Sequence, residues 1–127
     1  MEFNDIEANI REKYKDATTL KDNGGYANSI YLSGYCVELA LKYAIAKHMK
    51  WTSCDVNKFK FLKVHELDFL ASLTGNIQIK TSNNWQIVSK WDEKKRYADP
   101  ATSSESNAED MLNAVKELVG EICKISL

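Results

Sequence analysis

Apolar residues recur along most of this chain at the three- and four-residue spacing that is typical of amphipathic helices. The pattern is clearest near the C-terminus, in Ala108, Met111, Leu112, Val115, Leu118, Val119 and Ile122. Ser106 or Asn107 is expected to cap this helix, because a side-chain oxygen there can accept from a backbone N–H of the first turn. Glu109 and Asp110 in that turn are favoured by the helix dipole. The sequence therefore predicts an amphipathic last helix that buries one stripe.

The first half of the chain predicts two long helices. The first covers residues 5 to 22, with Asn4 or Asp5 as its cap and Gly24-Gly25 as its stop. The second covers residues 26 to about 50. One of its faces is apolar through Ile30, Gly34, Val37, Leu41, Ile45 and His48, and another through Leu32, Cys36, Leu39 and Tyr43. A helix that is apolar on two sides must be covered on two sides, by its own bundle or by another subunit.

The middle of the chain predicts shorter pieces. Residues 51 to 64 are expected to form a short irregular or helical lid. A short third helix then follows His65 and runs through Leu67, Leu70 and Leu73 until Gly75 ends it.

Residues 76 to 83 alternate isoleucines with polar residues, but no second strand exists to pair with them, so a loop is expected. Asn84 is expected to cap a fourth helix, which runs from Trp85 to about Arg96. This helix stops before Pro100, because the residue that precedes a proline avoids the α conformation.

Few helix breakers interrupt these segments, since the 127 residues include one proline and five glycines. The sequence therefore predicts an all-α fold, an antiparallel bundle of about five helices in a single domain of residues 1–127. A chain of this length buries enough surface to fold without disulfides, a metal or a cofactor, and no cofactor is expected.

Charge is balanced along the chain, with 17 Lys and Arg against 18 Asp and Glu for a net charge of −1. No global field attracts nucleic acid or an anionic membrane, so any anion site must be local. The N-terminus lacks a basic segment followed by an apolar run, and charged residues interrupt the longest apolar stretch, residues 26 to 46. A cytoplasmic protein that makes no membrane contact is expected.

The three cysteines, at positions 36, 54 and 123, show neither a paired pattern nor metal-ligand spacing, so reduced thiols are expected. Cys54 could join His48 and His65 as metal ligands, but a zinc site needs four well-placed groups, and no metal site is expected. The sequence has no Walker loop, Gly-x-Ser-x-Gly or His-Glu-x-x-His motif. P-loop hydrolysis, serine-hydrolase chemistry and zincin chemistry therefore have no support.

Glu38 and Lys42 stand four residues apart in the most apolar helix, a spacing that suits an ion pair. One interpretation is an ion pair that stabilises the helix by about 0.3 to 0.5 kcal/mol. The other is a polar notch that meets a ligand or a second subunit. His65 is a third candidate, either as a structural residue or as a general base in a cleft.

A second cluster mixes cations with aromatic rings, the combination that binds phosphates and bases. Its members are Lys90, Lys94, Lys95 and Arg96 with Trp85, Trp91 and Tyr97. Asp92 and Glu93 weaken its charge, and a solvated helix face with Trp91 turned inward would account for the same residues.

The order of these segments resembles the HEPN domain family. The resemblance rests on Tyr26-Ala27, on Gly34-Tyr35-Cys36-Val37-Glu38-Leu39-Ala40-Leu41-Lys42, on His65-Glu66-Leu67 with Leu70, and on Arg96-Tyr97 before the last helix. It implies a small helical bundle, commonly dimeric, that in many cases is encoded beside a minimal nucleotidyltransferase in a toxin–antitoxin or antiviral defence system.

The resemblance also implies that catalytic members are metal-independent ribonucleases, which use an arginine and, after four to six intervening residues, a histidine. At that spacing this chain has Asp16, Ala17 and Thr18 after Arg11, and Ala101, Thr102 and Ser103 after Arg96. Without that imidazole, cleavage of RNA lacks its general base.

We therefore expect a module without catalysis that binds a nucleotide or RNA phosphate, or a nucleotidyltransferase partner. The expected binding residues are Glu38, Lys42, His65, Lys95, Arg96 and Tyr97. One alternative is a ribonuclease toxin with an unrecognised base such as His65, and another is a dimeric interaction module without a ligand. The two apolar faces of the second helix also predict a two-fold homodimer.

Overall fold

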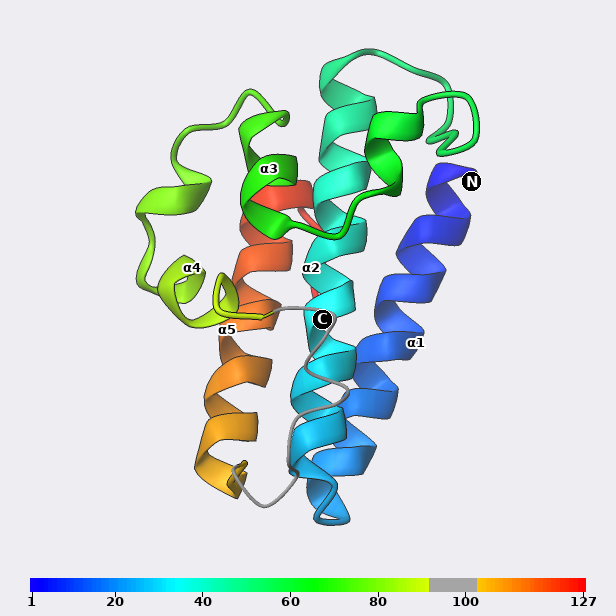
Figure 1. Ribbon diagram of the computed structural model, residues 1–127. Helices are drawn as coiled ribbons and strands as arrows, with labels where there is room; N and C mark the ends of the chain where they lie inside the picture. Colours follow the sequence, from blue (N-terminus) through cyan, green and yellow to red (C-terminus); the bar gives the residue numbers. More distant parts are fainter. Residues whose placement is uncertain (92–102) are drawn as a thin grey trace.

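The computed structural model describes residues 1–91 and 103–127, which form five α-helices, two short 3₁₀ helices and no strand. Three long helices make the bundle: α1 (Phe3–Asp22), α2 (Tyr26–His48) and α5 (Glu105–Cys123). Figure 1 shows that α1 runs antiparallel to α2, whereas α5 runs in the same direction as α2. The predicted all-α bundle is confirmed.

Four shorter elements lie between α2 and α5. They are η1 (Lys60–Lys63), α3 (Leu67–Ser72), η2 (Ile79–Thr81) and α4 (Asn83–Val88). Because α3 packs against α2 and α4 packs against α5, this segment covers the side of the bundle away from α1 (Figure 1). The expected loop over residues 76 to 83 is confirmed, apart from the single turn of η2 and from Asn83, which begins α4.

Each apolar face of α2 is covered in part within one chain, since Ile30, Leu32, Leu39 and Tyr43 are only half-buried. On the α1 side, Cys36 Sγ donates to the carbonyl of Ile10 at 3.5 Å, and Ser29 Oγ donates to the carbonyl of Ala17 at 2.7 Å. Val37, on the other predicted face, is fully buried. The prediction for His48 is wrong, because it is exposed at the C-terminal end of the helix. The homodimer that these two faces predicted stays a prediction.

The stripe on α5 is as predicted. Its members from Ala108 to Val119 are buried, and Ile122 is half-buried. Tyr14 of α1 donates its hydroxyl to the carbonyl of Leu112 at 3.2 Å, which ties the first helix to the last. Within the described part of the chain, no helix is both long and apolar enough to span a membrane.

The helix starts differ from the predicted caps. Ser104, and not Ser106 or Asn107, caps α5, since its Oγ accepts from the backbone N–H of Asn107 at 3.2 Å. In the same way Ser82, and not Asn84, caps α4. α1 begins at Phe3 with no side-chain cap, so Asn4 and Asp5 lie inside its first turn.

The fourth helix is shorter than predicted. α4 ends at Val88, well before Arg96, and the backbone N–H of Trp91 then donates to the carbonyl of Val88 at 2.9 Å. This turn brings the indole of Trp91 back onto α2, where it is 5% exposed. A continued helix would have to give up this packing.

Candidate functional site

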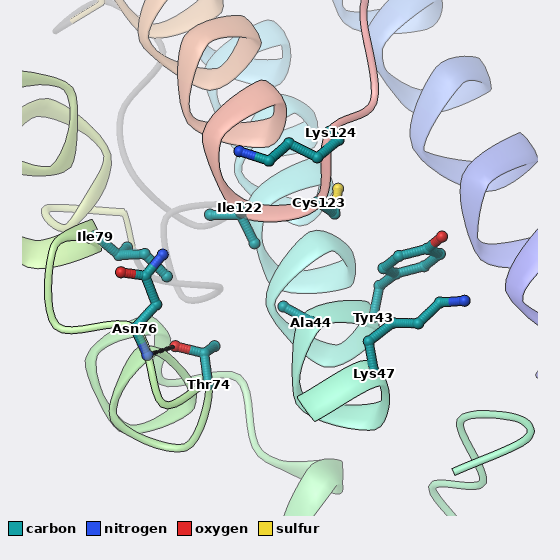
Figure 2. A pocket seen from close by; sticks show the side chains of 9 residues that line it. All are labelled: Tyr43, Ala44, Lys47, Thr74, Asn76, Ile79, Ile122, Cys123 and Lys124. Atoms are coloured by element: carbon teal, nitrogen blue, oxygen red, sulfur yellow. Dashed lines mark hydrogen bonds between the residues drawn. The ribbon is translucent and has the colours of Figure 1, made fainter. Parts of the chain in front are cut away.

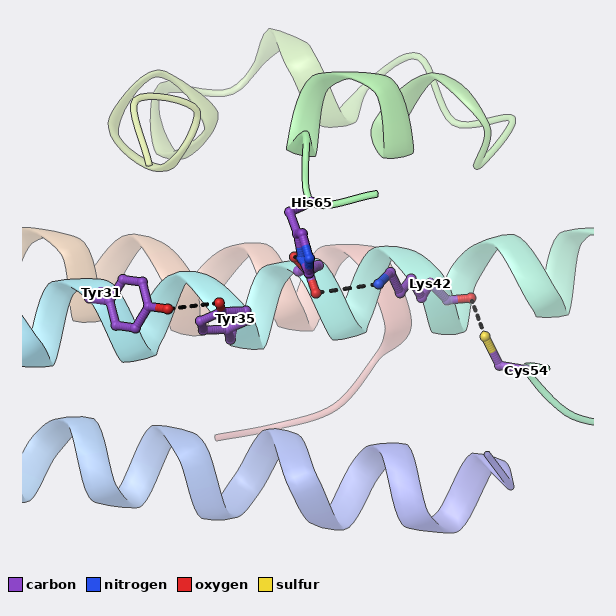
Figure 3. A network of polar contacts seen from close by, with 6 residues as sticks. Tyr31, Tyr35, Lys42, Cys54 and His65 are labelled. Carbon is purple, nitrogen blue, oxygen red and sulfur yellow. Dashed lines mark hydrogen bonds and ion pairs between the residues drawn. The ribbon is translucent and has the colours of Figure 1, made fainter. Parts of the chain in front are cut away.

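Three of the predicted site residues meet beside α2. Glu38 lies near the middle of this helix, Lys42 one turn later, and His65 two residues before α3 begins. Oε2 of Glu38 lies 3.3 Å from Nζ of Lys42, and Oε1 lies 2.8 Å from Nδ1 of His65 (Figure 3). One carboxylate therefore contacts a partner on its own helix and a partner from the segment that covers it.

This charge centre is buried on one side and reaches the surface on the other. The side chains of Glu38 and Lys42 are 5% and 8% exposed, whereas that of His65 is 40% exposed. The predicted ion pair of Glu38 and Lys42 is therefore confirmed, but it is buried. In a buried pair each charge loses hydration and depends on the other for compensation, so the energy of a surface pair does not apply.

The Glu38 carboxylate also determines the orientation of the His65 ring. Toward an ionised Glu38, Nδ1 of His65 is the donor in this contact, because a carboxylate without a proton can only accept. Glu38 is thus a positioning residue, which fixes the orientation of the His65 ring.

Aromatic rings lie on one side of this centre, toward the N-terminal end of α2 (Figure 3). The ring of Tyr35 lies edge-on to that of His65, with the centroids 6.4 Å apart. The hydroxyls of Tyr31 and Tyr35 lie 2.8 Å apart (Figure 3), and Trp91 donates its indole N–H to the carbonyl of Tyr31 at 2.9 Å. Gly34 makes room for Trp91, because a Cβ at this position would overlap the indole.

The structure describes only part of the predicted basic and aromatic cluster. Lys95, Arg96 and Tyr97 lie outside the described residues. The two tryptophans of the cluster, Trp85 and Trp91, are 4% and 5% exposed, so neither presents a ring face for a base to stack on. Trp91 is turned inward, as the alternative predicted, whereas the helix on which that alternative placed it ends at Val88.

The thiols of this region are poor nucleophiles. Burial raises the pKa of Cys36 to about 12 and that of Cys123 to about 11, and it also raises the pKa of Cys54. All three are free cysteines. Among residues 1–91 and 103–127, no three His, Cys, Asp or Glu side chains converge where they could hold a metal ion.

A pocket that the sequence did not predict lies between the C-terminal ends of α2 and α5. Figure 2 shows this pocket, which has a volume of about 350 Å³. It is lined by Tyr43, Ala44, Lys47, Thr74, Asn76, Ile79, Ile122, Cys123 and Lys124. These residues come from three separate segments of the chain, so no local sequence pattern could have predicted the pocket. None of the predicted site residues lines this pocket.

The match with known families covers both α2 and the segment that carries His65. A model of the HEPN domain family matches residues 11–125, nearly the whole chain. The chain belongs to the HEPN domain family. The charge centre of Glu38, Lys42 and His65 therefore lies inside the HEPN domain, and the resemblance noted from the sequence is confirmed. No curated protein and no solved structure gives a significant match. HEPN membership supports a module whose function is connected with nucleotides or RNA.

Proposed function

We propose that this HEPN domain binds the phosphate of a nucleotide or of RNA beside His65, without cleaving it. The observation that carries the proposal is the 2.8 Å contact between buried Glu38 and the more exposed His65. A ring held by a buried carboxylate loses little further freedom when it contacts a ligand, and such preorganisation favours binding. Lys42 compensates the Glu38 charge from the other side and is too buried to reach a ligand directly.

The absence of catalysis in this proposal rests on the sequence. Neither Arg11 nor Arg96 is followed by a histidine at the spacing of the catalytic HEPN ribonucleases. Transfer within RNA needs one group to take the proton of the attacking hydroxyl and a second to protonate the leaving oxygen. The described part of the centre has one imidazole for these two tasks, and its lysine is paired with Glu38.

A direct test compares the two histidines of the chain. His65→Ala is expected to weaken binding of a nucleotide panel and of a mixed RNA pool at least severalfold, measured by calorimetry or fluorescence anisotropy. His48→Ala is the matched control, since His48 is an exposed residue at the end of α2 and should leave binding unchanged. Equal binding by the parent and His65→Ala would contradict the proposal.

Arg96 gives a second test from the sequence. If it contributes to the same site, Arg96→Lys should weaken phosphate binding although the charge is kept, because only the planar guanidinium can bind a phosphate through two parallel hydrogen bonds. Binding that is unchanged in both Arg96→Lys and Arg96→Ala would remove Lys95, Arg96 and Tyr97 from the proposed site.

A ribonuclease with His65 as its base is the second candidate function. It is favoured by the same contact, since a carboxylate that orients an imidazole is the arrangement of a general base. The parent protein is incubated with a mixed RNA pool for hours and the products are resolved on a gel. Intact RNA supports the binding module, whereas cleavage that is lost in His65→Ala supports the enzyme.

We also propose an oligomeric state and a partner for this domain, both of which the family resemblance implies. The module would act as a homodimer and would contact a nucleotidyltransferase encoded beside it, in a toxin–antitoxin or defence system. Light scattering at tens of micromolar tests the dimer, because an interface of ordinary size persists at that concentration. A monodisperse monomer would contradict the homodimer.

A further inference from the structure

The loop that leaves α2 carries three aromatic rings in contact. It passes the N-terminal end of α1 and returns to α2 through η1 (Figure 1). Trp51 and Phe59 stack with parallel rings, their centroids 3.9 Å apart and their planes at 6°. The Phe61 ring lies 6.3 Å from Trp51 and 6.2 Å from Phe59, and Phe61 is 40% exposed. The loop thus presents one exposed ring beside a stacked pair.

Backbone contacts hold this loop in place. The N–H of Trp51 donates to the carbonyl of Ala46 at 2.9 Å, which closes the end of α2. Further along, the N–H of Cys54 donates to the carbonyl of Met1 at 2.9 Å. Leu62 of η1 is fully buried in the core. The rings therefore have a fixed arrangement before any ligand arrives, which reduces the entropy lost on binding.

Exposed lysines alternate with the rings along this loop. Lys50 precedes Trp51, and the next rings fall in the run Lys58-Phe59-Lys60-Phe61, with Lys63 two residues later. Within the described part of the chain, none of these four lysines forms an ion pair.

The acidic neighbour in this loop does not neutralise them. Residues 50 to 63 contain one acidic residue, Asp55. Its Oδ1 accepts from the backbone N–H groups of Asn57 and Lys58, each at 3.0 Å, and so stabilises the turn. The loop is therefore a local positive region on a chain whose net charge is −1. We call Lys50, Trp51, Lys58, Phe59, Lys60, Phe61 and Lys63 the lysine–aromatic surface.

We propose that the lysine–aromatic surface binds single-stranded nucleic acid, with a base stacked on Phe61 and the backbone phosphates against the lysines. Rings and cations that alternate are the combination that single strands require, since every base offers a flat face and every phosphate a charge. A duplex hides its base faces and would use the lysines alone. This inference does not rest on the proposed function, because it involves neither His65 nor Arg96.

A nucleic acid fits this surface better than an anionic membrane does. A membrane-binding loop needs apolar side chains that project into the lipid or a helix with one broad apolar face. Here two of the three rings are half-buried and stacked on each other, and the loop contains only the single turn of η1.

The first experiment measures anisotropy of a labelled single-stranded RNA of twelve nucleotides with the full chain. Phe61→Ala is expected to weaken binding roughly 5- to 150-fold, the range for loss of one stacked base. Phe69→Ala is the matched control, because Phe69 is also exposed, at 45%, but lies on α3. Similar affinity for Phe61→Ala and the parent would overturn the inference, and circular dichroism checks that both variants fold.

The second experiment tests the lysines by salt dependence. Each phosphate contact on a single strand contributes about 0.7 to the slope of log K against log salt. The double variant Lys60→Gln/Lys63→Gln should therefore lower the slope by about 1.4. Lys15→Gln/Lys116→Gln removes the same charge from exposed positions on α1 and α5 and should leave the slope nearly unchanged. Equal slopes for both double variants would overturn the inference.

Further probes distinguish a site for single strands from a site for a duplex or a membrane. Tighter binding of a duplex RNA, or of vesicles of phosphatidylcholine and phosphatidylserine, than of the single strand would overturn the inference. A single-stranded DNA of the same length tells whether the ribose contributes. RNA binding that is lost in His65→Ala but kept in Phe61→Ala would support the proposed function and overturn this inference. RNA binding that is lost in Phe61→Ala but kept in His65→Ala would support this inference and contradict the proposed function.

Discussion

Oε1 of Glu38 lies 2.8 Å from Nδ1 of His65, although twenty-seven positions separate the two residues in the chain. The other carboxylate oxygen contacts the Lys42 ammonium at 3.3 Å. Glu38 and Lys42 are buried, so little water can solvate the Lys42 ammonium. The Glu38 carboxylate therefore compensates its charge. The stability of the bundle and the orientation of His65 therefore depend on the same side chain.

Removal of Glu38 alone should be costly. Glu38→Leu leaves the Lys42 ammonium buried without its carboxylate, and we expect a loss of about 3 to 5 kcal/mol in the free energy of unfolding, measured in urea. Glu7 and Arg11 form an exposed ion pair at the same spacing, so Glu7→Ala should cost less than about 1 kcal/mol.

The double variant Glu38→Leu/Lys42→Met tests the cause of that loss. It replaces both charges with apolar groups, so it should regain much of the stability that Glu38→Leu loses. If the double variant were less stable than Glu38→Leu, an uncompensated lysine could not be the reason for the loss.

Leu118→Ala should destabilise the protein by about 2 to 5 kcal/mol, because Leu118 is fully buried in the middle of the α5 stripe. The loss combines the lost burial of apolar surface with the cost of a cavity. Its neighbour Glu117 is exposed, and Glu117→Ala should change the unfolding free energy by less than about 0.5 kcal/mol. Chemical denaturation measures both, and similar values for the two variants would contradict the orientation of α5.

Two helical glycines should respond to alanine in opposite directions. At Gly34 a Cβ would overlap the indole of Trp91, so Gly34→Ala should cost about 1 to 3 kcal/mol from overpacking. At Gly120 the nearest atom to a new Cβ is 3.8 Å away, so Gly120→Ala should stabilise by up to about 1 kcal/mol. Thermal unfolding gives the signs, and tryptophan fluorescence should shift only in the Gly34 variant.

Alkaline pH should weaken the fold through Cys36. Burial raises the pKa of this thiol to about 12 in the folded state, against about 8.5 when the chain is unfolded. Between these values only the unfolded state releases the proton, so the stability that is present below pH 8.5 is lost as the pH rises.

The Cys36 effect can be isolated by substitution. From pH 8 to pH 10 the parent should lose roughly 2 kcal/mol more than Cys36→Ala, because most other titrations are common to both proteins. Denaturation curves at the two pH values give the difference. An equal loss in both proteins would show that this thiol titrates alike in the folded and unfolded states.

The long helices could be predicted from the sequence because their apolar spacing already determines which side is buried. The α5 stripe is an example, since the residues from Ala108 to Val119 that the period selects are the ones that pack inward. The helix ends could not be predicted as well. Ser104 and Ser106 are equally good caps by residue type, and the structure uses Ser104. Local chemistry does not distinguish two such candidates.

Contacts between distant segments were the harder part to predict. Nothing between Trp85 and Pro100 breaks a helix by residue type, yet α4 ends at Val88 so that Trp91 can reach Gly34. The Glu38 and Lys42 pair follows from helical spacing, whereas the contact of Glu38 with His65 depends on the path of the whole intervening loop. In the sequence, only the family resemblance links His65 with this pair.

The central place of α2 determines how the molecule can open. α2 packs against α1, α3 and α5, so its amide hydrogens exchange with solvent only when the whole bundle separates. α3 and α4 are six residues each, and their amides can exchange through local opening at lower free energy. His65 lies just before α3, so a ligand bound to His65 would hold α3 against α2. Slower exchange in α3 would therefore report ligand binding without any change in the exchange of α2.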